Sequence, residues 1–205
     1  MIVYNSSARM DHLSFDAKDV SAKTAIPVIY VNQDVVKKHF EDESASLDIK
    51  LVTDIEEKYR NGNNVVGYID NGANSTVVLG AHYDHLGFGE DGNSLVRVNE
   101  KVIHNGADDN ASGTSALIEL SRILMDKKYK NSNYLFIAFS GEELGLFGSK
   151  YFVENPTIDI AKINYMINMD MIGRLNDSNK AITVGGVGTS PSWSFISAEN
   201  KLPFS

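Results

Sequence analysis

The amino-acid sequence predicts an α/β fold with a mostly parallel, mixed central sheet, because predicted strands and helices alternate from residue 64 onwards. The predicted strands at residues 76–81 and 134–139 are apolar on both faces, as in a sheet that is covered on both sides. Between them, apolar residues recur at helical spacing over residues 112–127. In such folds ligands bind beyond the carboxyl ends of the strands, so a site is expected there.

A small β-rich segment, residues 1–62, precedes this α/β part. Residues 26–31 are apolar and β-branched, which predicts a short strand. Asn32 or Asp34 is expected to cap a short helix directly after it. Residues 48–55 partly alternate between polar and apolar and predict another strand.

The second domain, residues 63–205, holds the alternating elements. Expected strands cover residues 65–69, 76–81, 134–139, 163–169 and 181–184, and expected helices cover 112–127, 143–153 and 192–200. Lysines in the last turn of the first of these helices suit the negative end of its dipole. Pro156 ends the second helix, because proline cannot continue the helical hydrogen bonding.

The composition argues against several function classes. The formal net charge of −8 in 205 residues makes nucleic acid an unsuitable partner, because phosphate binding needs a basic face. No apolar run approaches the roughly 20 residues of a membrane-spanning helix, so no membrane span is predicted. No Gly-x-Ser-x-Gly phrase supports serine hydrolase chemistry. The chain has no cysteine, so histidine, aspartate and glutamate must hold any metal ion.

Histidine and carboxylate residues gather at four places, each of which follows a predicted strand or opens a predicted helix. These places are residues 81–85, 106–110, 140–143 and 168–171. Because ligands collect at one edge of such a sheet, the four places are expected to converge on one site. Imidazole and carboxylate groups are metal ligands, so the convergence predicts a metal site.

His82 and Asp84 lie two residues apart at the end of a predicted strand, so their side chains are expected to face the same way. His82 is the candidate metal ligand, and Asp84 is the group that would fix the orientation of its imidazole. The alternative is a buried, hydrogen-bonded histidine at a sheet edge. His85 competes with His82 as a ligand but is one residue out of phase with the strand.

Asp108 and Asp109 lie in a glycine-bounded loop that opens a helix. Asp109, Asn110 or Ser112 can serve as the helix N-cap. Asp108 lies one position further out, which leaves both of its oxygens free to bridge two ions.

Glu142 and Glu143 directly follow a buried strand. Adjacent side chains point in different directions, so one can bind metal while the other faces a bound water. The alternative is a solvated helix N-terminus, where acidic residues are favourable. Asp170 ends an apolar run, where a carboxylate is costly unless it is paired or bound to metal, and an ion pair with Arg174 is its alternative.

Taken together, these phrases resemble the co-catalytic zinc exopeptidases of the bacterial leucyl aminopeptidase and aminopeptidase Y family, whose relatives include glutamate carboxypeptidase and glutaminyl cyclase. The phrases are Gly-Ala-His-Tyr-Asp-His at 80–85, His-Asn-Gly-Ala-Asp-Asp-Asn-Ala-Ser-Gly at 104–113, Phe-Ser-Gly-Glu-Glu-Leu-Gly-Leu-Phe-Gly-Ser at 139–149, and Asn-Met-Asp-Met-Ile-Gly at 168–173. The resemblance covers about residues 64–174 and extends to the order and spacing of the phrases. It implies a three-layer α/β/α zinc-exopeptidase fold.

The resemblance also implies roles for individual residues. By position, His82 and Asp170 would hold one zinc ion, Glu143 would hold the other, and Asp108 would bridge the two, giving two zinc ions per intact site. Asp84 would orient His82, and Glu142 would be the general base. The family often has a cis peptide bond after the bridging aspartate, here the bond from Asp108 to Asp109.

The implied activity is that of a metallo-aminopeptidase acting on peptides with a free N-terminus, secreted or periplasmic. Carboxypeptidase activity, glutaminyl cyclisation on the same fold, and a non-catalytic binding role like that of the transferrin receptor ectodomain stay open. The oligomeric state also stays open.

The chain departs from the family pattern in one respect. The family's second zinc takes a further histidine well beyond the last phrase, but no histidine follows His104 here. We interpret residues 63–205 as a catalytic domain whose C-terminal part is missing. Residues 1–62 resemble part of the protease-associated insert that some family members carry.

Overall fold

The structure is a computed structural model that describes residues 1–7, 9, 24–42, 44, 46, 48–52, 59–96, 102–174, 178 and 183–193. The chain divides into two compact units, Met1–Asn61 and Gly62–Ser205, one residue before the predicted boundary. Each unit is described by itself. Within the described ranges, no helix is long and apolar enough to cross a membrane.

The first unit contains a small parallel sheet and one helix. Strand β1 (Ile2–Tyr4) pairs with β2 (Ile29–Val31), and α1 (Gln33–His39) follows directly. Asn32 caps α1 as predicted, because its side-chain oxygen accepts a hydrogen bond from the backbone N–H of Val35 at 2.9 Å. The strand predicted at residues 48–55 is absent from 48–52, and its remainder lies outside the described residues. The likeness of this unit to a protease-associated insert stays a prediction.

The second unit is built on a four-stranded sheet in the order β3-β5-β4-β6. The strands are β3 (Val65–Ile69), β4 (Thr76–His82), β5 (Asn133–Phe139) and β6 (Ile163–Asn168). Strands β5, β4 and β6 are mutually parallel, whereas β3 runs antiparallel to β5 at one edge. The sheet is therefore mixed and mostly parallel, which confirms the predicted fold class.

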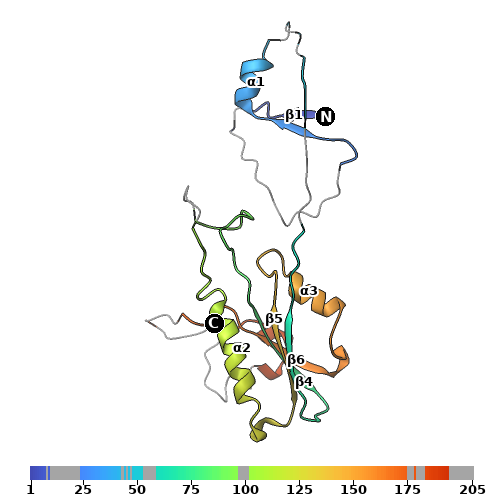
Figure 1. Cartoon of the computed structure of the whole chain (residues 1–205), viewed down its shortest axis with the longest axis vertical. Helices are drawn as coiled ribbons and strands as arrows, with labels where there is room; N and C mark the ends of the chain where they lie inside the picture. Colours follow the sequence, from blue (N-terminus) through green and yellow to red (C-terminus); the bar gives the residue numbers. More distant parts are fainter. Residues whose placement is uncertain are drawn as a thin grey trace. The chain divides into compact units, whose positions relative to one another are not determined.

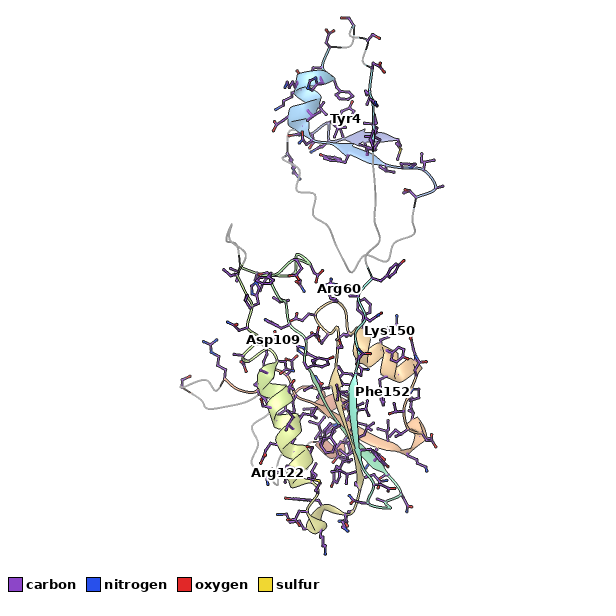
Figure 2. All side chains as sticks on the ribbon, viewed as in Figure 1. Tyr4, Arg60, Asp109, Arg122, Lys150 and Phe152 are labelled. Atoms are coloured by element: carbon purple, nitrogen blue, oxygen red, sulfur yellow. The ribbon has the colours of Figure 1, made fainter. Side chains whose placement is uncertain are left out.

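Among the residues that the structure describes, one α-helix covers each face of the sheet. These helices are α2 (Ala111–Ile123) and α3 (Phe147–Glu154), which lie on opposite sides of the sheet in Figure 1. Alternate residues of β4 point to the two faces, as the two-residue period of a strand requires. Val77 and Leu79 pack with Leu117 of α2 in one core cluster. Val78 packs in the other cluster with Phe152 of α3, which lies on the sheet side of its helix (Figure 2). The result is three layers.

The described part of the second unit also contains three shorter helical turns, η1 (Lys127–Tyr129), η2 (Ile160–Lys162) and η3 (Val187–Thr189). The strand predicted at 181–184 is not formed at residues 183 and 184, and its first half lies outside the described residues. Most of the helix predicted at 192–200 also lies outside them.

The third helix of the chain begins later than predicted, at Phe147 instead of residue 143. Gly141, Gly145 and Leu146 have positive φ angles of 68°, 125° and 61°, which a right-handed helix cannot contain. Glu142 and Glu143 therefore lie in a loop that follows β5, not in the first turn of a helix. This excludes the solvated helix N-terminus as an explanation for the two acids.

Candidate metal centre

His82 is the last residue of β4 and is buried, with 2% of its surface exposed. Its Nδ1 lies 3.0 Å from the main-chain oxygen of Asp84. A carbonyl oxygen can only accept a hydrogen bond, so Nδ1 carries the proton, and in the neutral imidazole Nε2 has a free lone pair. The imidazole is thus held by the main-chain carbonyl of Asp84, whose carboxylate lies 3.7 Å from Nδ1.

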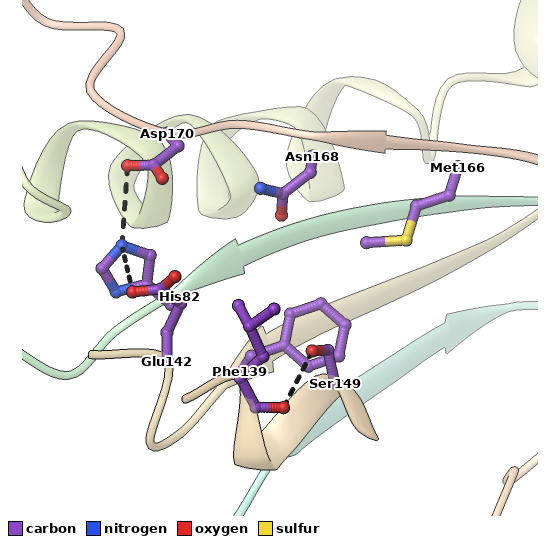
Figure 3. Close-up of a pocket in the computed structure, with 8 residues that line it drawn as sticks. His82, Phe139, Glu142, Ser149, Met166, Asn168 and Asp170 are labelled. Carbon is purple, nitrogen blue, oxygen red and sulfur yellow. Dashed lines mark hydrogen bonds and ion pairs between the residues drawn. The ribbon is translucent and has the colours of Figure 1, made fainter. Parts of the chain in front are cut away.

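The Nε2 atom of His82 faces three carboxylates. It lies 3.2 Å from Asp109, 3.5 Å from Asp170 and 3.8 Å from Glu142, and Figure 3 shows it between the last two. Two atoms bound at about 2.0–2.1 Å to a tetrahedral zinc lie roughly 3.3 Å apart. His82, Asp109 and Asp170 therefore have both the chemistry and the spacing of a metal-binding group. Among the described residues, Asp170 forms its ion pair with this histidine and not with Arg174.

A second group lies beside the first and shares Asp109 with it. The Nδ1 of His85 lies 2.6 Å from a carboxylate oxygen of Glu143 and 3.9 Å from Asp109. His85, Asp109 and Glu143 are the three members of this group. One carboxylate common to two groups of ligand atoms is the arrangement that two neighbouring cations need.

The structure brings Asp109 into both groups and leaves Asp108, the predicted bridging residue, outside them. The carboxylate of Asp108 instead accepts a hydrogen bond from the backbone N–H of Gly173 at 2.8 Å. The cis peptide bond is displaced in the same way, since it joins Asp109 to Asn110 and not Asp108 to Asp109. Loop residues do not follow a strand or helix period, so the sequence could not distinguish the two neighbours.

The carboxylate of Asp84 holds the loop that carries the two glutamates. One oxygen accepts the backbone N–H of Glu142 at 3.1 Å, and the other accepts that of Glu143 at 3.3 Å. The end of β4 is thereby tied to the loop after β5. Asp84 positions both glutamates, a role that the sequence did not indicate.

Asn110 ties the start of α2 to the end of β6, and sequence reasoning considered it only as a helix cap. Its side chain is 2% exposed. The amide oxygen accepts the backbone N–H of Gly113 at 3.0 Å, which makes Asn110 the N-cap of α2. The amide nitrogen donates to the main-chain oxygen of Met169 at 2.9 Å. Asp109 and Asp170, each adjacent to one of these anchor points, are therefore held at a fixed separation.

We expect Asn110→Ala to lower the free energy of unfolding by about 2–6 kcal/mol, because it leaves two buried backbone groups without a protein partner at about 1–3 kcal/mol each. Chemical denaturation of the variant measures this change. Asp126→Ala is the matched control, since it removes the exposed N-cap of η1, whose oxygen accepts the Lys128 N–H at 3.1 Å. Equal losses in the two variants would contradict the anchoring role of Asn110.

The site concentrates negative charge, which helps to raise the pKa values of His82 and Glu142. Burial lowers the pKa of His82, but the carboxylate of Glu142, the hydrogen bond to Asp84 and the carboxylate of Asp170 outweigh it, so this pKa is raised. Burial raises the pKa of Glu142, and the negative charges of neighbouring acids add to this against the opposing effect of His82. A raised pKa suits a carboxylate that takes up and returns a proton. A divalent cation would neutralise the excess charge.

A cavity of about 210 Å³ adjoins the first group (Figure 3). His82, Glu142 and Asp170 line its polar side. Phe139, Leu146 and Met166 supply apolar surface to the same cavity. A ligand in this space would meet both the carboxylates and an apolar wall.

Comparison with known proteins is consistent with this site. The model of the family described as "Peptidase family M28" matches residues 64–202. Aminopeptidase YwaD of Bacillus subtilis is 27% identical over 180 residues, which cover 84% of this chain and 34% of that protein. An aminopeptidase of Pseudomonas aeruginosa is 29% identical over 183 residues, covering 87% of this chain and 31% of that one. The chain thus spans about a third of the length of these relatives.

Solved structures show the same fold. LapB from Legionella pneumophila matches with a TM-score of 0.51 at 25% identity, over 69% of this chain and 37% of that one. Porphyromonas gingivalis glutaminyl cyclase matches with a TM-score of 0.52 at 24% identity, over 66% of this chain and 48% of that one. Because the family model covers more than half of its residues, the chain belongs to peptidase family M28.

Proposed function

We propose that this chain carries the metal centre of a zinc-dependent aminopeptidase, a hydrolase that acts on the N-terminal peptide bond of its substrate. The observation that carries the proposal is the carboxylate of Asp109, which belongs to two adjacent groups that each contain a histidine and a further acid. The names of the aminopeptidase relatives support the reaction, and a "Probable zinc metalloprotease" of Pyrenophora tritici-repentis, 40% identical over 68 residues, supports the metal. A secreted or periplasmic location is part of the proposal and rests on the family resemblance.

His82, Asp109 and Asp170 would hold one zinc ion, and Asp109 and Glu143 would contribute to holding the second. Bound zinc supplies Lewis acidity, which lowers the pKa of a coordinated water and polarises a carbonyl group. Nitrogen and oxygen ligands of this kind are those that zinc takes in catalytic sites.

Glu142 is the proposed general base. It lines the cavity, its carboxylate lies 3.8 Å from Nε2 of His82, and it belongs to neither group of candidate ligands. Its raised pKa favours acceptance of a proton from the attacking water and return of that proton to the leaving amine. Asp84 fixes the backbone from which Glu142 projects.

A substrate with a free amino terminus suits the charge of the cavity. Its ammonium group would be attracted by the carboxylates of Glu142 and Asp170, while the apolar wall would take an uncharged side chain. An acylated amino terminus would lose the ion pairing. The preferred class of substrate is therefore a peptide with an unblocked N-terminus.

Glutaminyl cyclisation is a second candidate. The glutaminyl cyclase fold supports it, as does the fact that the His82 group has the spacing of a metal site by itself. The two reactions differ in product: hydrolysis releases an amino acid, whereas cyclisation leaves a pyroglutamyl peptide.

One assay separates the candidates. The purified chain is incubated with leucine p-nitroanilide, its N-acetylated form and a glutaminyl peptide, before and after chelation and after zinc is restored. We expect hydrolysis of the unblocked anilide alone, lost on chelation and regained with zinc. Pyroglutamate formation would establish cyclisation instead, and a zinc-loaded chain that turns over none of the three would contradict both proposals.

A further inference from the structure

The imidazole of His85 lies among the acids of the second group, and the proposed mechanism gives it no role. In the described part of the chain, Nδ1 of His85 contacts two carboxylate oxygens, one of Glu143 at 2.6 Å and one of Asp109 at 3.9 Å. His82 differs from it, because its Nδ1 is occupied by a main-chain carbonyl and its Nε2 faces the acids. Each of the two groups thus presents one imidazole nitrogen to the shared carboxylate of Asp109.

The ring of His85 is held in place from two sides. Gly106 has a φ of 63°, and a Cβ atom there would lie 2.9 Å from Cγ of His85, so the loop packs directly on the ring. His104 meets it edge-on, with 6.3 Å between ring centroids and 74° between ring planes. His104 is itself anchored, since its Nε2 lies 3.0 Å from the hydroxyl of Ser94. An imidazole fixed in this way is preorganised toward Glu143 and Asp109.

The distances between ligand atoms in the second group lie on either side of the distance expected in a zinc site. Ligand atoms on one tetrahedral zinc lie roughly 3.3 Å apart, and the two distances from Nδ1 of His85, 2.6 Å and 3.9 Å, lie on either side of this value. A shift of Nδ1 by about 0.65 Å, half the difference between the two distances, would make them equal. The side chains of His85 and Glu143 are 20% and 18% exposed, which leaves room for such a change and for entry of an ion.

We propose that His85 binds the second cation directly through Nδ1, together with Glu143 and Asp109. This inference rests on the proposed two-metal function and adds a ligand to it. The competing explanation is that His85 only orients Glu143 through a hydrogen bond.

Zinc binding distinguishes a ligand from an orienting residue. Zinc stoichiometry and affinity are measured by competition with a chromophoric chelator for the wild-type chain and for His85→Gln. We expect two zinc ions on the wild type and one on the variant, with affinity at the second position reduced by more than about 100-fold. That loss exceeds the roughly 10–100-fold that removal of an orienting partner costs.

Two controls locate the effect. His39→Gln makes the same change at an exposed histidine of α1 that belongs to neither group, so this variant is expected to bind two zinc ions. Asp170→Asn weakens the first group alone, and its remaining zinc is expected at the His85 group. Two zinc ions bound to His85→Gln with unchanged affinity would overturn the inference.

A measurement on the wild-type chain removes any dependence on the folding of a variant. With ¹⁵N-labelled histidine, addition of zinc is expected to shift the Nδ1 resonance of His85 and the Nε2 resonance of His82 to the positions of metal-bound nitrogens. A shift for both at two zinc ions supports the inference. Two bound zinc ions without a shift at His85 overturn the inference and leave the two-metal function standing. A single bound zinc, with a shift at His82 alone, overturns the two-metal premise as well.

Discussion

Replacement of Glu142 by glutamine is expected to lower kcat by about 10²–10⁴-fold, the contribution of a general base, while zinc binding is retained. Glutamine has the same shape but cannot accept the proton of the attacking water. The backbone N–H that Asp84 anchors is unchanged, so the loop is expected to keep its place. Steady-state kinetics on an unblocked leucine substrate, with zinc content determined on the same sample, measures both effects.

Glu119→Gln is the matched control for this experiment. Glu119 lies on α2, its side chain is 55% exposed, and it pairs with Arg122 one turn away. The same chemical change there is expected to leave kcat within a factor of about two, since exposed ion pairs contribute little. Full activity in Glu142→Gln, with two zinc ions bound, would show that another group moves the proton.

Replacement of Asp109 by asparagine is expected to weaken both metal positions at once, because its carboxylate is common to the two groups. The amide keeps one oxygen but loses the negative charge that stabilises two adjacent cations. We expect each zinc affinity to fall by about 100-fold or more, beyond the effect of losing an orienting partner. Elemental determination of zinc after dialysis, for variant and wild type side by side, measures the loss.

The neighbouring Asp108→Asn variant provides the control. Asp108 uses its carboxylate oxygen to accept the Gly173 N–H, and an asparagine oxygen can accept the same hydrogen bond. This variant is expected to keep both zinc ions. If Asp108→Asn lost zinc and Asp109→Asn retained it, Asp108 would be the shared ligand, as the sequence predicts, and Asp109 would not.

The sheet and the convergence of the motifs could be predicted from the sequence because both follow from a regular period. Alternation along β4 sends Val77 and Val78 to opposite faces, and parallel strands deliver their following loops to one edge. His82 and Asp170 lie at or next to strand ends, so their placement followed from the strands. Adjacent loop residues have no such period, so the sequence cannot separate Asp108, the predicted bridging residue, from Asp109.

Two other features depend on backbone geometry that residue types do not signal. Leu146 adopts a left-handed conformation that is uncommon for leucine, so the delayed start of α3 left no trace in the sequence. His85 is out of phase with β4 in the sequence, but the strand ends at His82 and its two-residue period does not apply beyond that residue. The orientation of His82 by a main-chain carbonyl was equally invisible, because every residue has one.

The strands that deliver these groups, β4, β5 and β6, follow one another in the sequence, but in the sheet β4 lies between β5 and β6. The candidate ligands extend from residue 82 to residue 170, so no short segment of the chain contains either group. The centre can form only after the crossovers that bring these strands together, which are long-range contacts of the kind that form slowly. Zinc would then bind the folded sheet far better than the unfolded chain, and its free energy of binding would add to the stability of the topology itself. A metal at this position would stabilise the arrangement in which β5, β4 and β6 lie side by side. Release of the metal would therefore be a sensitive indicator of partial unfolding.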